Sequence, residues 1–225
     1  MDTLYDRAEA GRELARLLKS YEKETPIILG MPRGGVVVAY EIASLLHAPL
    51  DVIVTRKIGA PNQPEFAIGA IAPGDIVLLN KEVIKDIQLS NTEIQSLIDN
   101  ETQEMKRRLK LYRGNRPAID VKNKTIIVAD DGLATGLTAL AAIRSLRQLH
   151  PKKIILAMGA CARDSTKRLQ QEVDELICLL TPEPFYAVGQ WYRYFDQTTD
   201  EEVIQLLTLN RNALSEIAMI QERAE

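Results

Sequence analysis

The sequence is poor in several features that mark specialised classes of protein. Its 225 residues include only two cysteines, two histidines and 5% aromatic residues, and the formal net charge is −3. A charge this weak excludes a chain that binds polyanions over its whole surface, so we expect no DNA partner. No apolar run approaches the ~20 residues of a membrane span, and the charged N-terminus lacks a signal-peptide core, so no membrane association is expected.

The two cysteines, Cys161 and Cys178, both have apolar neighbours in the sequence. Their spacing matches no metal-ligand motif. We predict that they are reduced, buried thiols, as is typical of cytosolic proteins, and we expect a cytoplasmic location.

The chain instead shows a regular alternation of apolar strands and helices. Strands this apolar, separated by helical patterns, predict a parallel sheet with helices on both faces, and so an α/β fold. An amphipathic helix is expected near the N-terminus, and capping boxes at Ser90/Glu93 and Thr199/Glu202 predict the starts of two later helices. The predicted core strands are 25–29, 50–56, 124–129, 152–158 and 174–180.

An insertion follows the second predicted strand. Two β-like runs, 66–71 and 76–79, flank Pro73-Gly74, which predicts a hairpin arm. Residues 57–75 contain prolines and glycines but few large apolar side chains. Such a segment has little to anchor it, so we predict a mobile arm.

The stretch VADDGLATGLT, residues 128–138, predicts a binding site for a sugar phosphate. Glycines allow close backbone approach, threonines add hydroxyl donors, and the following helix presents free N–H groups, which together suit a monophosphate. Asp130 and Asp131 would repel that phosphate but would accept hydrogen bonds from ribose hydroxyls. The predicted phosphate loop consists of Gly132, Leu133, Ala134, Thr135, Gly136, Leu137 and Thr138.

Two other interpretations of this stretch are open. The aspartates could belong to an acidic turn that only caps a helix. Adjacent aspartates beside a glycine also suggest a haloacid dehalogenase-type phosphatase, although that class requires Asp-x-Asp on the first strand. The stretch is neither a P-loop nor a dinucleotide fingerprint, because the Lys-Ser/Thr pair and the glycine spacing are missing.

The segment IIVADDGLATGLT resembles the PRPP loop of the type I phosphoribosyltransferases, where PRPP is 5-phosphoribosyl 1-diphosphate. DRAEAGRELA, MPRGG, RKIGAPNQPEFAIGAI and TPEPFYAVGQWYRYFDQTTDEEV extend the resemblance over about residues 1–205, to a subfamily of stand-alone phosphoribosyltransferase-like proteins. The resemblance implies one domain over residues 1–225. It would have a core at about 25–180, an inserted arm at 57–118 that closes over the site, and a hood from residues 1–24 and 181–225.

The resemblance also assigns roles to basic residues. It implies that the turn Pro32, Arg33, Gly34 and Gly35 binds pyrophosphate, with Arg33 as a catalytic cation. Arg56 and Lys57 would meet the leaving pyrophosphate as further catalytic cations. Alternatively, Arg33 is an ordinary surface arginine in a turn. Arg56 and Lys57 are alternatively two solvated charges at the end of a strand. Mg²⁺ is the expected cofactor, carried mainly by substrate and water, with Asp130 and Asp131 as its protein contacts.

The expected activity is transfer of the phosphoribosyl group between PRPP and an unidentified small-molecule acceptor, a nitrogenous base, with release of pyrophosphate. Members that use 6-oxopurines carry an aspartate at the position of Ala134, which counts against those acceptors. A non-catalytic PRPP or nucleotide sensor that binds RNA is the alternative, and a homo-oligomer is left open. The basic stretch 106–116 could close over phosphates, bind RNA or form a solvated helix face. The hood aromatics could bind the acceptor or form the hood's own core; they are Phe185, Tyr186, Trp191 and Tyr192.

Overall fold

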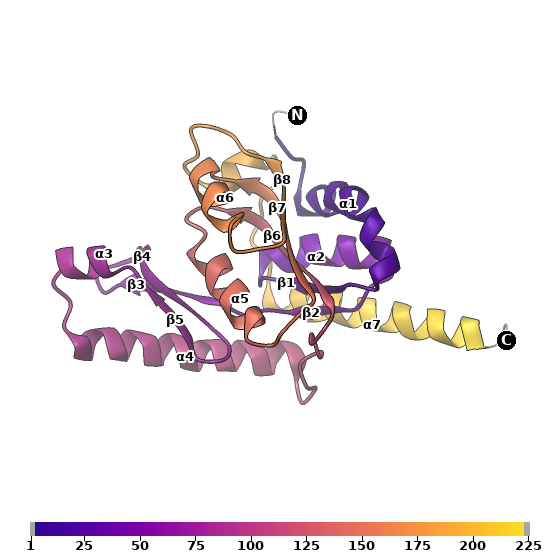
Figure 1. The fold of residues 1–225 in the computed structure, drawn as a ribbon, viewed down its shortest axis with the longest axis horizontal. Coiled ribbons are helices and arrows are strands. Elements are labelled where there is room, and N and C mark those ends of the chain that lie inside the picture. Colours follow the sequence, from indigo (N-terminus) through magenta and orange to yellow (C-terminus); the bar gives the residue numbers. More distant parts are fainter. Residues whose placement is uncertain (1–2, 223–225) are drawn as a thin grey trace.

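A five-stranded parallel sheet forms the centre of the protein. The computed structural model describes residues 3–222. The strand order is β2-β1-β6-β7-β8 (Figure 1). The predicted α/β fold with a parallel central sheet is therefore confirmed. The bounds are Ile27–Gly30 for β1, Leu50–Val52 for β2, Thr125–Leu133 for β6, Lys153–Cys161 for β7 and Glu175–Leu180 for β8.

Helices cover both faces of this sheet, because neighbouring strand residues point to opposite sides. Ile28 and Ile127 belong to the buried cluster that includes α1 and α2, whereas Ile126 and Val128 belong to the cluster that includes α5. None of the helices within residues 3–222 is both long and apolar enough to cross a membrane. The helix bounds are Arg7–Leu17 for α1, Gly34–Leu45 for α2, Leu137–Arg147 for α5, Arg163–Leu169 for α6 and Asp200–Glu222 for α7, with short 3₁₀ turns η1 at Lys19–Glu24 and η2 at Val188–Trp191.

The insertion forms a second, three-stranded antiparallel sheet that extends to one side of the core (Figure 1). The hairpin predicted around Pro73-Gly74 is confirmed, because Ala72 pairs with Ile76. The second predicted strand is too long, since β2 ends at Val52 and Arg56 already belongs to the arm sheet. The arm elements are β3 at Arg56–Ala60, β4 at Gln63–Ala72, β5 at Ile76–Leu79, α3 at Lys81–Asp86 and α4 at Asn91–Arg113.

The base of the arm is better anchored than its composition predicts. Ile58, Ile68 and Ile71 are at most 1% exposed. Ala70 and Ala72 of β4 form a small buried cluster with Ala141 of α5, so the arm sheet packs directly on the core. Residues 61–66, which form the turn after β3 and the first residues of β4, are exposed. The prediction of a weakly anchored segment over 57–75 is therefore wrong for the base of the arm.

Side-chain caps fix the helix starts that the sequence predicted. Ser90 and Glu93 form a reciprocal capping box at the start of α4, and the Thr199 hydroxyl accepts a hydrogen bond from the Glu202 N–H at 3.1 Å. Such caps satisfy N–H groups that have no partner within the helix. They fix the starts of α4 and α7, which extend to opposite sides of the core (Figure 1) and meet where the Tyr112 hydroxyl of α4 donates to Asp200 Oδ1 of α7.

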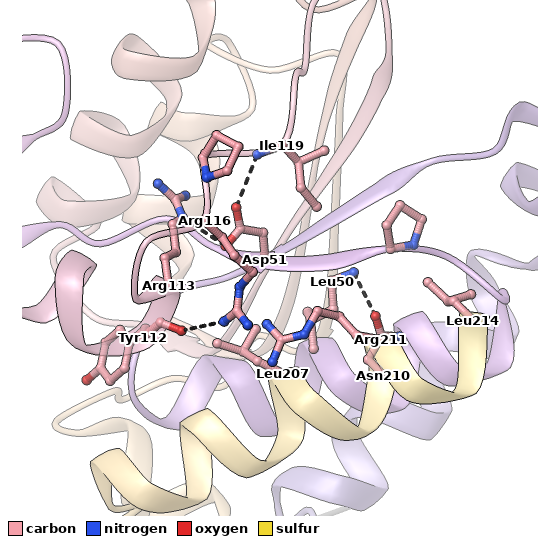
Figure 2. Close-up of a pocket in the computed structure, with 12 residues that line it drawn as sticks. Leu50, Asp51, Tyr112, Arg113, Arg116, Ile119, Leu207, Asn210, Arg211 and Leu214 are labelled. Atoms are coloured by element: carbon pink, nitrogen blue, oxygen red, sulfur yellow. Dashed lines mark hydrogen bonds and ion pairs between the residues drawn. The ribbon is translucent and has the colours of Figure 1, made fainter. Parts of the chain in front are cut away.

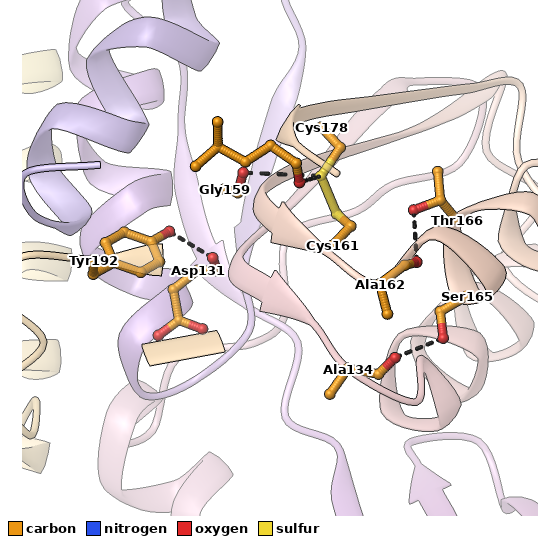
Figure 3. Close-up of a disulfide and its surroundings, with 10 residues drawn as sticks. Asp131, Ala134, Gly159, Cys161, Ala162, Ser165, Thr166, Cys178 and Tyr192 are labelled. Carbon is orange, nitrogen blue, oxygen red and sulfur yellow. Dashed lines mark hydrogen bonds between the residues drawn. A yellow bond between two sulfur atoms is a disulfide. The ribbon is translucent and has the colours of Figure 1, made fainter. Parts of the chain in front are cut away.

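Cys161 and Cys178 form a disulfide, so the prediction of two free thiols is wrong (Figure 3). The two residues lie on the adjacent parallel strands β7 and β8, with Cα atoms 6.5 Å apart, a separation that a disulfide spans. The pairing depends on strand register, which the spacing of two cysteines does not reveal. The disulfide closes a loop with a sequence separation of 17 residues.

We predict that reduction of this disulfide lowers the melting temperature. Closing a loop of ~15 residues stabilises a protein by about 3 kcal/mol, which corresponds to roughly 6–12 °C for a domain of this size. Thermal unfolding with and without dithiothreitol, alongside a count of free thiols, measures the effect. The variant Cys161→Ser/Cys178→Ser is the control and should not respond to dithiothreitol. Two titratable thiols in the folded, untreated protein would contradict the prediction.

Candidate active site

The turn after β1 and the carboxyl end of β6 lie against each other. The Met31 N–H donates to the Ala129 carbonyl oxygen at 3.0 Å. A Cβ at Gly34 would lie 2.1 Å from Asp131 Oδ2, and one at Gly35 would lie 2.6 Å from Asp130 Oδ1. Only glycine therefore allows this turn to approach the carboxylates so closely. The structure thus brings together the residues predicted to bind pyrophosphate and those predicted to bind ribose.

Asp131 is held by an ion pair from the N-terminal helix. Arg7 Nε lies 2.7 Å from Asp131 Oδ2, and both side chains are largely buried. The Arg7 guanidinium also donates to the Asp196 carbonyl oxygen at 2.7 Å and stacks 3.8 Å above the Phe195 ring. These contacts fix the orientation of the carboxylate. The ion pair with Arg7 involves Oδ2, and Asp131 Oδ1 takes no part in it.

Asp130 has a different electrostatic environment from its neighbour. Its Oδ1 accepts a hydrogen bond from the Asp131 N–H at 2.8 Å. Burial raises the pKa of Asp130 well above its ordinary value, and the negative charge of Asp131 raises this pKa further. The pair therefore offers two different groups to a diol: an arginine-bound carboxylate and a carboxyl group that keeps its proton to higher pH.

The predicted phosphate loop is shorter than expected, because β6 continues to Leu133 and pairs there with Cys161 of β7. The turn proper is residues 134–136. Gly136 has φ +72°, a left-handed conformation that glycine adopts without strain, and it precedes the first turn of α5. N–H groups at the start of such a helix have no acceptor within the helix and suit an anion. Thr135 and Thr138 flank this turn and carry its hydroxyl groups.

Side chains of α6 donate hydrogen bonds to carbonyl oxygens of this loop. The Ser165 hydroxyl donates to the Ala134 carbonyl oxygen at 2.6 Å (Figure 3), and Arg168 donates to the Thr135 carbonyl oxygen. These bonds engage the carbonyl oxygens of Ala134 and Thr135, so the two oxygens point toward α6. Sequence reasoning missed both residues, since nothing in their spacing relates α6 to a loop 30 residues earlier.

The predicted catalytic cations are divided between two places. Arg33 lies near Tyr112 of α4. Burial and the hydrogen bond to Asp200 raise the pKa of that phenol, and the positive charge of Arg33 only opposes this increase. Arg56 Nε instead lies 2.7 Å from Glu101 Oε2, and Lys57 Nζ lies 2.8 Å from Glu65 Oε2. Arg56 and Lys57 therefore form ion pairs within the arm, and only Arg33 belongs to the turn beside the two aspartates.

The aromatic residues of the C-terminal segment occupy unlike environments. Tyr192 is buried, and its hydroxyl donates to the Asp131 carbonyl oxygen at 2.5 Å (Figure 3). Phe185 stacks on Trp191 with ring centroids 6.4 Å apart, whereas Tyr186 is 78% exposed. Tyr192 thus supports the β6 end directly, and the Phe185–Trp191 pair packs against the core.

Arg7 is the main residue of this site that sequence reasoning missed. It lies in DRAEAGRELA, where the sequence showed only an amphipathic helix. Asp6, directly before it, caps α1 by accepting a hydrogen bond from the Glu9 N–H at 2.7 Å. This cap fixes where the helix begins and so directs Arg7 toward β6. A lone arginine in the first turn of a helix, where its charge opposes the helix dipole, is a weak signal of such a role.

Known proteins resemble this chain over most of its length. The family model described as "Phosphoribosyl transferase domain" matches residues 1–190. A Mycobacterium tuberculosis protein provisionally named a phosphoribosyl transferase is 39% identical over 220 residues, which cover 98% of this chain and 50% of the relative. The chain thus spans about half the length of the curated relatives it matches most extensively. A ribose-phosphate pyrophosphokinase of Pyrococcus furiosus is 40% identical over 60 residues, 26% of this chain and 22% of that protein.

Among solved structures, TT1426 from Thermus thermophilus has a TM-score of 0.75 and is 35% identical, covering 91% of this chain and 97% of that one. The carboxylate pair and the glycine turn lie at the carboxyl ends of parallel strands, where open α/β sheets bind their ligands. The chain belongs to the phosphoribosyl transferase domain family, whose enzymes are pentosyltransferases.

The raised pKa of Asp130 predicts the pH dependence of Asp130→Asn. A carboxyl group whose pKa is higher in the folded state contributes stability at low pH and loses that contribution as pH rises through the folded pKa. Asn does not ionise, so the variant should be more stable than the parent at pH 8. A gain of about 1 kcal/mol would raise the melting temperature by roughly 2–4 °C, and the difference should vanish near pH 4.

Melting curves without ligand between pH 4 and 8 check this prediction. Asp86→Asn, which changes an exposed carboxylate, is the matched control and should show no such trend. A variant that is less stable than the parent at every pH would mean that Asp130 acts as an ionised structural group.

Proposed function

We propose that the protein is a Mg²⁺-dependent phosphoribosyltransferase that moves the 5-phosphoribosyl group between PRPP and a nitrogenous base, with release of pyrophosphate. One observation carries the proposal: the turn 32–35, the Asp130–Asp131 pair and the glycine turn 134–136 lie at neighbouring ends of β1 and β6. PRPP carries a diphosphate, a diol and a monophosphate, and each has a matching group in this arrangement.

The two aspartates would bind the ribose of PRPP. Asp131 is oriented by Arg7, and its Oδ1, which takes no part in that ion pair, would accept a hydrogen bond from a hydroxyl. Asp130, with its raised pKa, can accept a hydrogen bond and, while protonated, also donate one. Charge-assisted bonds to an ionised carboxylate contribute about 1.5–3 kcal/mol, so Asp131 would provide most of the affinity for the diol.

Arg33 and the N–H groups of Gly34 and Gly35 would stabilise the leaving group. Breaking the bond at C1′ leaves positive charge on the sugar and develops negative charge on the pyrophosphate. A guanidinium can bind a diphosphate through two parallel hydrogen bonds, and donors already in place lower the barrier. Arg56 and Lys57 would contact the pyrophosphate only after breaking their ion pairs with Glu101 and Glu65. This requires a conformational change in the arm. The exposed segment 61–66 is the part of the arm most free to move.

The residues present suit a magnesium ion that arrives with the substrate. Within the described residues, no group of three or more His, Cys, Asp or Glu side chains could hold a metal ion. Asp130 and Asp131 supply the hard oxygen donors that Mg²⁺ prefers, and two of them suffice for an ion otherwise bound by phosphate oxygens and water. When bound, the ion would neutralise negative charge on the diphosphate.

The acceptor stays unidentified. Ala134 is exposed at the phosphate turn, and no carboxylate stands at the position where 6-oxopurine enzymes of the family carry their aspartate. We therefore propose an acceptor other than hypoxanthine or guanine. Tyr186 is the hood aromatic most open to a planar ligand, because Phe185, Trp191 and Tyr192 already pack against other residues.

A non-catalytic PRPP or nucleotide sensor is the second candidate function. The ion pairs of Arg56 and Lys57 favour it, because cations that stay neutralised by Glu101 and Glu65 would not assist departure of pyrophosphate. The cytoplasmic location remains a prediction, and the Cys161–Cys178 disulfide weighs against it, since disulfides are rare in that compartment.

We predict that PRPP with Mg²⁺ binds the parent protein and that Asp131→Asn weakens this binding about tenfold. Asn keeps an acceptor oxygen but loses the charge, a difference of roughly 1–2 kcal/mol per hydrogen bond. Calorimetric titration measures affinity, and pyrophosphate release with a panel of nitrogenous bases measures turnover. Asp86→Asn is the control and should behave as the parent does.

The combination of results separates the two functions. Binding together with base-dependent release of pyrophosphate supports the enzyme. Tight binding without release for any base supports the sensor. The absence of binding at millimolar PRPP would contradict both.

A further inference from the structure

A cavity apart from the candidate active site lies along the edge strand β2, between the end of α4 and the middle of α7 (Figure 2). Its volume is about 110 Å³, enough for several water-sized groups. None of the residues proposed to bind PRPP lines it. Apolar side chains form much of its wall: Pro49, Leu50, Pro117, Ile119, Leu207 and Leu214.

Three arginines but only one carboxylate line this cavity, so it has an excess of positive charge. The carboxylate, Asp51, is 7% exposed and already has several partners. Arg113 Nε lies 3.0 Å from its Oδ1, and that oxygen also accepts from the Val52 N–H at 2.8 Å. Its Oδ2 accepts from the Ile119 N–H at 3.4 Å. Arg113 and Asp51 thus neutralise each other.

The other two arginines have only neutral partners. Arg116 donates to the Tyr112 carbonyl oxygen at 3.2 Å, and Arg211 donates to the Thr208 hydroxyl at 2.8 Å. Figure 2 shows their guanidinium groups entering the cavity next to each other. Within residues 3–222, neither forms an ion pair with a carboxylate. Burial lowers the pKa of Arg211 and the neighbouring charge of Arg116 lowers it further, while the Asp51 carboxylate opposes this decrease.

We propose that this cavity binds a phosphate-sized oxyanion between Arg116 and Arg211. Each guanidinium has N–H groups left over from its bond to Tyr112 or Thr208, and the planar fork of donors matches a phosphate bidentately. The two positive charges repel each other, and an anion between them turns this repulsion into attraction. The neutralised Asp51 carboxylate opposes the anion only weakly. The site lies on the edge strand and is separate from the strand ends of β1 and β6.

The test compares phosphate binding to the full-length parent and to Arg116→Gln/Arg211→Gln. Calorimetric titration with inorganic phosphate at constant ionic strength gives affinity and stoichiometry, and melting curves give stability without phosphate. Arg12→Gln/Arg16→Gln is the matched control, because it removes two exposed arginines of α1 and the same net charge. We expect the cavity variant to lose one phosphate site or to bind it at least about tenfold more weakly.

The same variant separates a binding role from a structural one. Removal of two repelling charges should leave the melting temperature without phosphate unchanged or raise it, while the phosphate-induced rise shrinks. Phosphate binding equal to that of the parent in affinity and stoichiometry would overturn the proposal. An equal loss in the α1 control would also overturn it, since the parent's response would then come from net charge.

A second titration with phenyl phosphate distinguishes a phosphate ester from the free ion. Tighter binding than inorganic phosphate, again lost in the cavity variant, supports an ester whose apolar part lies against Leu207, Leu214 and Ile119. Tighter binding of inorganic phosphate supports the free ion. No binding of either anion to the parent at this cavity would overturn the proposal.

Discussion

The ion pair between Arg7 and Asp131 joins three distant parts of the chain at one point. Arg7 comes from α1, Asp131 from the end of β6, and Asp196, whose carbonyl oxygen binds the same guanidinium, from the segment before α7. Tyr192 adds a second link to Asp131. Two adjacent aspartates at a strand end repel each other, and an uncompensated buried charge typically costs 3–5 kcal/mol. Arg7 compensates this charge, so the site can keep both carboxyl groups and still fold.

This arrangement gives the two aspartates different properties without any difference in residue type. Asp131 is paired with a guanidinium, whereas burial and the negative charge of Asp131 raise the pKa of Asp130. The glycines at 34 and 35 bring a backbone turn within reach of both carboxyl groups. Arg33 in this turn and the Arg116–Arg211 pair at the cavity beside β2 would then bind separate anions, because Arg33 does not line that cavity.

The sequence predicted the features that local patterns encode. The apolar strands, the Ser90–Glu93 capping box and the hairpin at Pro73-Gly74 each depend on residues close together in the chain, and the structure confirms them. Asp130 and Gly35 lie close together because the paired parallel strands β1 and β6 end at the same edge of the sheet. Arg7 could not be found in this way, because it lies 124 positions from its partner.

Register and packing explain the predictions that failed. The disulfide requires β7 and β8 to be neighbours with Cys178 opposite Met158, and no single-sequence pattern specifies that register. The arm was expected to be weakly anchored because of its prolines and glycines, yet three buried isoleucines outweigh them. β6 extends through Gly132 because β7 continues beside it, which shortens the expected loop. Each failure concerns a contact between segments that are distant in sequence.

The central claim is that the diol of a phosphoribosyl ligand binds at Asp130 and Asp131 with its phosphate at residues 134–138. A crystal structure of the protein with PRPP and Mg²⁺ tests this directly. The account predicts a ribose hydroxyl within hydrogen-bond distance of Asp131 Oδ1, the Arg7–Asp131 pair retained, and the 5-phosphate at the start of α5. A ligand bound with its ribose away from β6, or a phosphate at the start of α5 with no sugar contact to either aspartate, would contradict it.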